Sequence, residues 1–460
     1  MAGAIYEVAL GGLNDLLRLI HKAFVPWMIK AQLRLDYLPK ERLEELQWRK
    51  LQALMKIAVE QTPFYRRRFK EIGAAPEDIR TAEDFAKIPL LTRDDILQHV
   101  EEMLTRPQET LRRGVSGGST GHPLAYYYGY ANKCFRLALR QRVFTWMGVK
   151  GLRPWLYLWG VSMRPNHPRV IRPWHRFAMP DFRYGIKSLN KASLAALAGD
   201  LLKIRPAVVI GYTSILYGLA LYLKENGIVL AKPPQAVIST VEILWPEHRQ
   251  LLEESYRAPV FDLYGNGENL YIAAECTART GLHVPMDHVY VEILADGGQA
   301  RMGEPGYLVV TDLDNMAMPF IRYRTDDIGS WSVSTCSCGR ELPMLRALCG
   351  RDTDFFFDRA GEAYPGINLE PSLRHLAVDG HAIRQFQLIQ TEQGHLQVLV
   401  VPGSGKESVL SDAILQALDQ LFHGQMALNL RWVESIQAEP SGKTRFAKST
   451  LPYSMNWNKS

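Results

Sequence analysis

Short apolar runs alternate with helical stretches between residues 133 and 260, and this alternation constrains the fold more than any other feature of the 460-residue chain. The runs at 155–160, 207–211 and 236–239 have the composition of buried strands, and residues 197–204 and 214–224 have helical spacing. A strand–helix–strand rhythm predicts a parallel sheet covered by helices. Such sheets bind ligands at the carboxyl ends of their strands, where the sequence places residues 211–214 and Glu242.

The segments on either side of this region have other patterns. Helices are predicted at 41–60 and 65–72, with Thr92 capping a third, and antiparallel strands at 289–294, 306–311 and 318–323. Beyond residue 350 the composition changes, and short strands (386–391, 395–401) and helices (369–376, 408–421) predict a small α+β unit. Residues 350–354 would then be the hinge between two units.

Composition limits the classes of partner and compartment. The net charge of +6 suits an anionic substrate but is too small and dispersed to indicate nucleic-acid binding. The five cysteines do not form the dense, even set of a secreted disulfide framework. The chain contains no apolar run of about 18 residues and no signal-peptide pattern, so we expect a cytoplasmic protein.

The stretch Ser116-Gly117-Gly118-Ser119-Thr120-Gly121 combines glycines with hydroxyl side chains and contains no acid. Glycine lets successive backbone N–H groups approach an anion, and the hydroxyls add donors. The stretch therefore predicts a loop that wraps a polyphosphate. It lacks the Gly-Lys-Ser/Thr ending of the P-loop, so that fold is not implied.

Four later stretches carry further candidate residues. Tyr264-Gly265-Asn266-Gly267-Glu268 offers an aromatic ring for a purine and a carboxylate for Mg²⁺. The others are Tyr323-Arg324-Thr325-Asp326-Asp327, whose acid suits a ribose diol, Gly350-Arg351, and Ser441-Gly442-Lys443, whose lysine follows a flexible pair. Taken singly, each also fits an ordinary turn, cap or tail.

The order and spacing of these five stretches resemble the adenylate-forming superfamily, and within it the phenylacetate–CoA ligase branch with its relatives linked to capsular polysaccharide genes. The resemblance implies that residues 116–121 cradle the ATP phosphates, that Tyr264 flanks adenine, that Glu268 ligates Mg²⁺ and that Asp327 holds the ribose. Arg351 would approach the nucleotide, and Gly265, Asn266 and Glu242 belong to the same expected site. Lys443 would be the catalytic lysine of adenylation.

The implied fold is α/β. A large N-terminal body, residues 1–349, would contain helix-covered mixed sheets and a small β-barrel-like part, and a small mobile α+β domain, residues 350–460, would supply Lys443. The implied reaction joins a carboxylic acid to ATP as an acyl-adenylate, followed by transfer to the thiol of CoA. An amine or amino sugar is the alternative acceptor, and a non-catalytic nucleotide-binding assembly factor is the alternative class of protein. The chain departs from the common pattern at His122, Asp326 and Thr353.

Cysteine and histidine form a second constellation, Cys276, His283, Cys336 and Cys338. Three cysteine thiolates and one histidine suit tetrahedral zinc. Because all four ligands would come from the protein, the set predicts a structural site. His288 is a rival for His283. Free thiols beside an unrelated histidine remain the alternative.

Residues 4–34 are apolar with helical spacing. Such a helix either packs on the protein's own body or binds a membrane surface or a partner. A homodimer is also compatible with the sequence.

Overall fold

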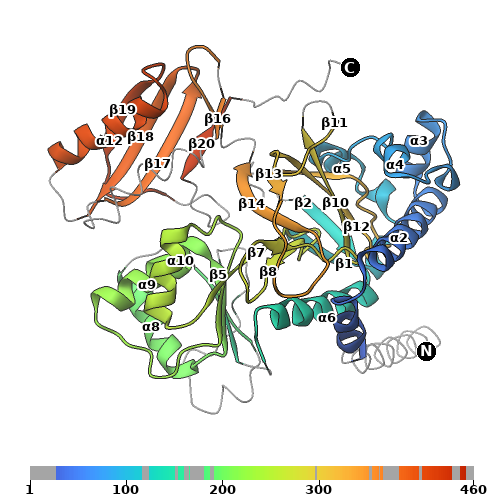
Figure 1. Ribbon diagram of the computed structural model, residues 1–460, viewed down its shortest axis with the longest axis horizontal. Coiled ribbons are helices and arrows are strands. Elements are labelled where there is room, and N and C mark those ends of the chain that lie inside the picture. Colours follow the sequence, from blue (N-terminus) through green and yellow to red (C-terminus); the bar gives the residue numbers. More distant parts are fainter. Residues whose placement is uncertain are drawn as a thin grey trace, which may run out of the picture.

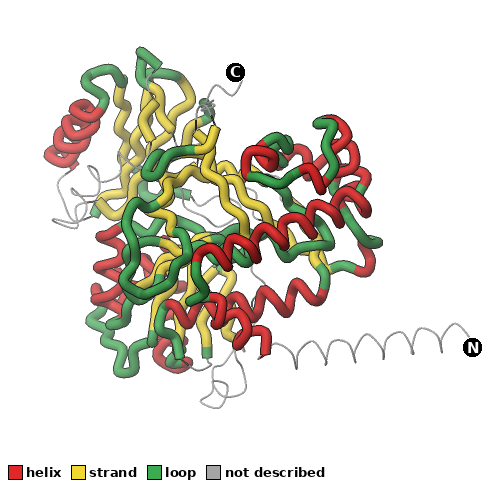
Figure 2. Tube along the Cα trace, turned by 45° about the vertical axis from the view of Figure 1, so that its right-hand side comes forward, coloured by secondary structure: helices red, strands yellow, loops and turns green. Residues whose placement is uncertain are grey.

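The computed structural model describes residues 27–116, 124–150, 154–159, 165, 181–186, 191–295, 298–351, 355–361, 363–365, 383–403, 407–437 and 446–451. Strands run through the interior and helices lie along the outside (Figure 2). Among these residues, no helix has both the length and the apolar character needed to cross a bilayer.

Twelve strands of the described part form one continuous sheet, in the order β11-β10-β12-β13-β14-β9-β8-β7-β6-β5-β3-β4. Its parallel part consists of β3 (Trp155–Trp159), β4 (Asp181–Gly185), β5 (Val208–Tyr212), β6 (Ala236–Thr240) and β7 (Val260–Tyr264). Its antiparallel part consists of β8 (Ala273–Glu275), β9 (Leu282–His283), β10 (Val289–Ala295), β11 (Gly298–Gln299), β12 (Gly306–Asp312), β13 (Tyr323–Trp331) and β14 (Met344–Arg351). The expected α/β class with mixed sheets is confirmed, and the antiparallel strands continue the parallel sheet.

Helices cover both faces of the parallel part because successive side chains of each strand point to opposite faces. Leu156 and Leu158 pack against α8 (Lys191–Ile204), α9 (Thr213–Glu225) and α10 (Pro246–Tyr256). Trp155 and Tyr157 face the other way and pack with α6 (Tyr130–Trp146). Figure 1 shows α8, α9 and α10 on one side of this sheet. The predicted strand–helix alternation is confirmed.

Helices of the N-terminal region cover the antiparallel part. They are α2 (Lys40–Gln61), α3 (Pro63–Glu71), α4 (Ala82–Ala86) and α5 (Arg93–His99), with 3-10 turns at Pro76–Asp78, Glu101–Met103 and Gln108–Thr110. Thr92 caps α5 as predicted, because its hydroxyl accepts from the N–H of Asp95 while the Asp95 carboxylate accepts from the N–H of Thr92. Residues 27–35 are also helical, and Trp27 is exposed. Residues 4–26 lie outside the described part, so both interpretations of the N-terminal segment stay open.

A hairpin of β1 (Arg112–Ser116) and β2 (Leu124–Tyr128) flanks the predicted phosphate loop. Its register pairs Ser116 with Leu124, and a Cβ at Gly114 would lie 2.1 Å from the Tyr126 ring, so only glycine fits there. Residues 117–121 lie outside the described residues.

The C-terminal part forms its own sheet, in the order β19-β18-β17-β20, with its own core. Its elements are β17 (Ile383–Glu392), β18 (His395–Pro402), α12 (Glu407–Leu421), β19 (Ala427–Trp432) and β20 (Ala447–Ser449), and a hairpin of β15 (Phe355–Phe357) and β16 (Ala363–Pro365) precedes them. The predicted strands and the helix at 408–421 are present, whereas the helix predicted at 369–376 lies outside the described residues.

One predicted strand is wrong. Residues 318–322 form no strand; β13 begins at Tyr323, so the segment expected as a turn, 323–329, is itself extended. Apolar residues at 318, 320 and 321 are buried in the core under α2 and α3, which explains their misleading pattern.

A buried ion network joins the N-terminal region to the body. Arg142 of α6 is fully buried and donates to Asp36 Oδ1 at 2.6 Å and to Asp287 Oδ1 at 2.7 Å. The indole of Trp146 donates to the other Asp36 oxygen at 2.8 Å. Such a network tolerates the loss of one member poorly, since the remaining charges stay buried.

We therefore expect Arg142→Met to lower the free energy of unfolding by about 3–5 kcal/mol, because Asp36 and Asp287 would lose their shared partner. Urea unfolding followed by tryptophan fluorescence measures the change. Arg42→Met is the control, since Arg42 pairs with Glu45 on the exposed face of α2. Equal stability of the Arg142→Met and wild-type proteins would contradict this view of the network.

Candidate active site and metal cluster

The end of β7 brings two predicted residues into contact. The Tyr264 hydroxyl donates to Asp327 Oδ2 at 2.8 Å, across 63 residues of sequence. Asp327 lies on β13, where its register partner on β14 is Arg351. The residues expected at adenine, at ribose and near the hinge thus come from three strands of one sheet.

The loop after Tyr264 is a tight turn that requires glycine. A Cβ at Gly265 would lie 1.4 Å from the Leu270 carbonyl oxygen. Asn266 closes the turn: its side-chain oxygen accepts from the N–H of Asn269 at 2.7 Å and its carbonyl from the N–H of Leu270 at 2.8 Å. Leu270 has a φ of +61°, a strained conformation for a branched side chain.

Glu268 lies in this loop, is nearly fully buried and has the two other motifs around it. Tyr126 lies on β2, the strand that follows the predicted phosphate loop. Burial raises the pKa of Tyr126 to about 12; the charge of Arg136 lowers this pKa and the charge of Glu268 raises it. Burial together with the charges of Glu268, Asp326 and Asp327 raises the pKa of Tyr323. Arg136 contacts both the Glu268 carbonyl oxygen and the rings of Tyr126 and Tyr128, so the loop that carries Glu268 lies close to β2.

Asp326 is one of the three departures from the expected pattern, and its φ is +62°. Asp tolerates this left-handed conformation better than most residues. Its carboxylate accepts from Arg324 at 2.9 Å, and the neighbouring Asp327 bonds Tyr264. The left-handed backbone at Asp326 thus lies directly before the residue that binds Tyr264.

Glu242 has a structural partner. Its carboxylate accepts from the Ser214 N–H at 2.7 Å and from the Ser214 hydroxyl at 3.1 Å, at the N-terminus of α9. A carboxylate there satisfies free N–H groups and complements the helix dipole. The contact links the two loops that sequence analysis placed at the carboxyl ends of β5 and β6.

The segment of Lys443 lies outside the described residues, but its neighbour Phe446 contacts the N-terminal body. The Phe446 ring lies 5.5 Å from that of Trp245 in an edge-on arrangement. Trp245 precedes α10, and Phe446 precedes β20. The C-terminal sheet therefore approaches the body close to the Glu242 loop.

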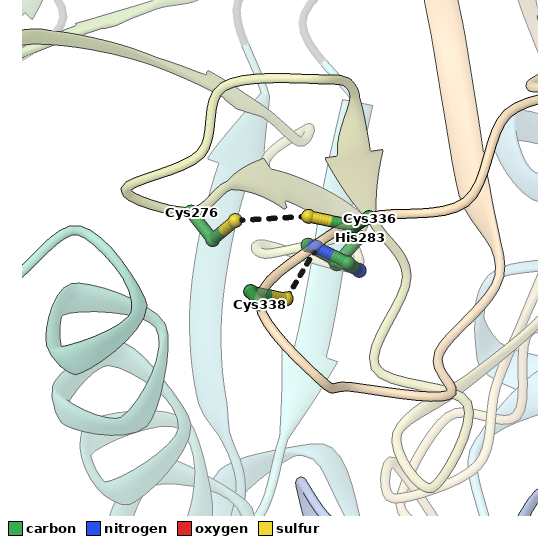
Figure 3. Close-up of side chains that lie close together, drawn as sticks. All are labelled: Cys276, His283, Cys336 and Cys338. Carbon is green, nitrogen blue, oxygen red and sulfur yellow. Dashed lines mark hydrogen bonds between the residues drawn. The ribbon is translucent and has the colours of Figure 1, made fainter.

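The predicted metal ligands form one cluster (Figure 3). Ligand atoms of Cys276, His283, Cys336 and Cys338 all lie within 4.8 Å of one another. Cys276 Sγ lies 3.5 Å from Cys336 Sγ, and Cys338 Sγ lies 3.4 Å from His283 Nε2. Tetrahedral zinc places sulfur ligands about 3.8 Å apart and sulfur and nitrogen about 3.5 Å apart, so these residues fit the ion.

The cluster also decides between the two histidines. Burial and the charge of Arg340 lower the pKa of His283 to about 4, which keeps its imidazole in the neutral, metal-binding form. Burial raises the pKa of the Cys276 thiol to about 11 without a metal. His288 instead faces Asp314, with 2.7 Å between its Nδ1 and Asp314 Oδ2.

Two contacts to the Glu268 loop were not predicted from the sequence, one from Arg136 and one from His288. Arg136 of α6 donates to the Glu268 carbonyl oxygen, and His288 Nε2 lies 3.1 Å from the Asn269 carbonyl oxygen. No motif marks Arg136, whose acceptor lies 132 residues away, and His288 was considered only as a metal ligand.

Comparisons with known proteins find similar sequences over most of the chain. The family model described as the CapK C-terminal domain matches residues 368–450. A phenylacetate–coenzyme A ligase of Thermus thermophilus is 26% identical over 422 residues, covering 85% of this chain and 89% of that protein. Protein CapK of Staphylococcus aureus is 23% identical over 429 residues, covering 89% and 90%.

Solved structures share the fold. 2-Hydroxyisobutyryl-CoA ligase, in the postadenylation state with 2-HIB-AMP, superposes with a TM-score of 0.75 at 21% identity over 90% of each chain. The amide bond synthetase McbA from Marinactinospora thermotolerans reaches 0.52 at 17% identity, covering 73% of this chain and 68% of that one. The chain is thus a homologue of the phenylacetate–CoA ligases and of CapK, and it has the fold of the adenylate-forming CoA ligases.

Proposed function

We propose that this protein activates a carboxylic acid with Mg·ATP as an acyl-adenylate and then transfers the acyl group to the thiol of CoA. The observation that carries the proposal is the hydrogen bond between Tyr264 and Asp327, which joins the expected adenine and ribose residues beside Glu268. Relatives named phenylacetate–CoA ligases and a structural neighbour bound to an acyl-AMP support it.

The first half-reaction needs positioning and charge compensation. A carboxylate oxygen of the acid attacks the α-phosphorus, the bond to the bridging oxygen breaks, and pyrophosphate leaves with the electron pair. Under this proposal residues 116–121 hold the phosphates, Asp327 the ribose, Tyr264 the adenine, and Arg351 and Glu242 the surrounding site. Glu268 would hold Mg²⁺, which would offset negative charge on the phosphates.

Lys443 supplies a positive charge to the reacting oxygens in this proposal. The contact between Phe446 and Trp245 supports it, because Phe446 follows the lysine by three residues and lies against the body. The second half-reaction follows once the thiolate attacks the acyl carbon and AMP departs. Residues 1–349 and 350–460 act as the two domains of this cycle.

An amine is the second candidate acceptor. The observation that favours it is the fold shared with an amide bond synthetase. AMP release that depends on CoA indicates a CoA ligase, and AMP release that requires an amine indicates an amide ligase.

We further propose that Cys276, His283, Cys336 and Cys338 hold a structural zinc ion. All four positions of a tetrahedral ion would then be filled by protein atoms, which leaves none for substrate. The ion would tie β8 and β9 to the loop before β14.

The proposed activity is tested by ATP–pyrophosphate exchange against a panel of aryl, acyl and amino acids without an acceptor. Exchange with one class of acid supports adenylation and identifies the acid. Absence of exchange with every class, in folded protein that contains its metal, contradicts the proposal.

Lys443→Ala should reduce acyl-adenylate formation roughly 100- to 1000-fold, because one preorganised charge at the reacting phosphate is worth that much. The measurement is exchange with the acid identified above. Lys448→Ala is the control, since Lys448 is an exposed lysine on β20. Exchange at the wild-type rate in the Lys443 variant would remove the lysine from the mechanism.

Asp327→Asn should raise the KM for ATP roughly 10- to 100-fold, because a charged acceptor for the ribose hydroxyls is lost. Tyr264→Phe should raise it only about 3- to 10-fold, since it removes one hydrogen bond to that acceptor. Asp326→Asn is the matched control, with the same chemical change one residue away. If all three variants behave alike, Asp327 has no special role at the ribose.

Purified protein should contain about one zinc ion per chain by elemental analysis, and Cys338→Ser should lower this content and the thermal midpoint together. Cys134→Ser is the control, because Cys134 is a buried cysteine of α6 outside the cluster. A wild-type zinc content below about 0.2 per chain would overturn the site.

A further inference from the structure

Two consecutive carbonyl groups of the Glu268 loop are each held by a buried basic side chain. The Arg136 guanidinium donates to the carbonyl oxygen of Glu268, and His288 Nε2 donates to that of Asn269 at 3.1 Å. Arg136 is 6% exposed, and His288 and Asn269 are fully buried. Neither basic group belongs to a motif that the proposed function uses.

The geometry makes His288 a double donor. A carbonyl oxygen accepts only, so the nitrogen that faces Asn269 carries a proton. The other nitrogen lies 2.7 Å from the Asp314 carboxylate, which also accepts. Burial would lower the pKa of His288, but the Asp314 hydrogen bond and the charges of Asp312 and Asp314 outweigh it and raise the pKa. The loop therefore meets two cationic groups.

The counter-ions come from the turn after β12. Asp312 Oδ2 lies 3.6 Å from Arg136, and Asp314 Oδ1 accepts from Lys50 of α2 at 2.5 Å. The turn is closed because Asp312 Oδ1 accepts from the backbone N–H groups of Asp314 and Asn315, at 2.9 and 3.1 Å. Arg136 and His288 are thus each paired with a carboxylate of the same closed turn, Arg136 with Asp312 and His288 with Asp314.

The same cluster holds the strand that leaves the phosphate loop. Asn315 Nδ2 donates to the Tyr127 carbonyl oxygen at 2.9 Å. The Arg136 guanidinium lies 5.8 Å from the ring centroid of Tyr126 and 5.1 Å from that of Tyr128. One arginine therefore contacts both β2 and the backbone of Glu268.

The loop needs such support because its own backbone is strained. Leu270 has positive φ, and Gly265 leaves no room for another arrangement. Without donors, the two carbonyl oxygens would be buried and unpaired, which is unfavourable because each would lose water without gaining a hydrogen bond. A loop freed from both donors would relax and move the Glu268 carboxylate.

We propose that Arg136 and His288 are positioning residues that fix the Glu268 loop relative to β2, so that the Glu268 carboxylate is held where it meets Mg·ATP. This inference rests on the proposed function of Glu268 as the Mg²⁺ ligand. The two residues contact backbone and aromatic rings, and the contact with the metal is left to Glu268. Their loss should weaken metal-dependent ATP binding more than metal-free ATP binding.

The test is calorimetric titration of ATP into the full chain with and without Mg²⁺. In wild-type protein Mg²⁺ should tighten ATP binding, and Arg136→Gln and His288→Gln should each reduce this gain roughly 10-fold or more, the usual effect of losing an outer partner of a metal ligand. Arg136→Lys keeps the charge and should restore part of the gain. It also serves as the test where Arg136→Gln does not fold.

Arg249→Gln is the matched control. Like Arg136, Arg249 donates to a backbone carbonyl oxygen and pairs with a carboxylate. Its acceptors are the Val260 carbonyl oxygen, at 2.6 Å, and Glu275. Val260 begins β7, so this contact lies at the end of the strand opposite the Glu268 loop. It should lower the thermal midpoint without changing the gain from Mg²⁺. If lower stability were the cause, every variant, including Arg249→Gln, would lose part of the Mg²⁺-dependent increase in ATP affinity in proportion to the fall in its thermal midpoint. That result would contradict a positioning role.

Two results overturn the proposal: folded Arg136 and His288 variants with the full wild-type gain, or a wild-type ATP affinity that does not respond to Mg²⁺. Failure of the proposed function looks different. Wild-type protein whose ATP affinity responds to Mg²⁺ but which exchanges no pyrophosphate with any acid would contradict adenylation alone, and the positioning roles would stand or fall on the variants.

Discussion

The site depends on β7, the strand at which the large sheet changes direction. On one side β7 pairs in parallel with β6, and on the other it pairs antiparallel with β8, through Leu263↔Ala274 and Tyr264↔Ala273. The chain must therefore leave Tyr264 and return to Ala273 within one short loop. That constraint explains the tight turn at Gly265 and the strain at Leu270, and it places Glu268 and Asp327 at one edge of the sheet.

Buried charges connect this edge to the N-terminal helices. Arg142 holds Asp287, whose backbone carbonyl accepts from Lys50 at 2.5 Å, and Lys50 also pairs with Asp314, the partner of His288. Burial alone would raise the pKa of Asp287, but Arg142 and Lys50 lower it. The chain of contacts is continuous from α6 and α2 to the Asn269 carbonyl oxygen. The buried residues that stabilise the N-terminal body therefore also hold the Glu268 loop in place.

Sequence reasoning reached the local features and missed the tertiary ones. Strand–helix alternation predicted the parallel part, and short motifs that resemble those of a known family pointed to Tyr264 and Asp327, because both signals are written in consecutive residues. The histidine of the cysteine cluster stayed open until the structure showed His283 against Cys338 and His288 against Asp314. Residues 318–321 were predicted to be a strand because apolar residues of a buried loop have the same composition as those of a buried strand. Arg136 had no signal, since its partners lie 132 and 176 residues away.

The link between the two parts of the chain is of a different kind from the network inside the body. The C-terminal sheet has its own core, and the Trp245–Phe446 pair reaches across from it. An edge-on aromatic pair adds about 0.5–1.5 kcal/mol beyond its buried area, whereas breaking a buried ion pair costs about 3–5 kcal/mol. A contact of the weaker kind breaks more readily than the buried ion network. The network therefore lies where it can fix the Glu268 loop and β2, and under the proposed function the weak contact would lie beside the lysine that enters and leaves the site.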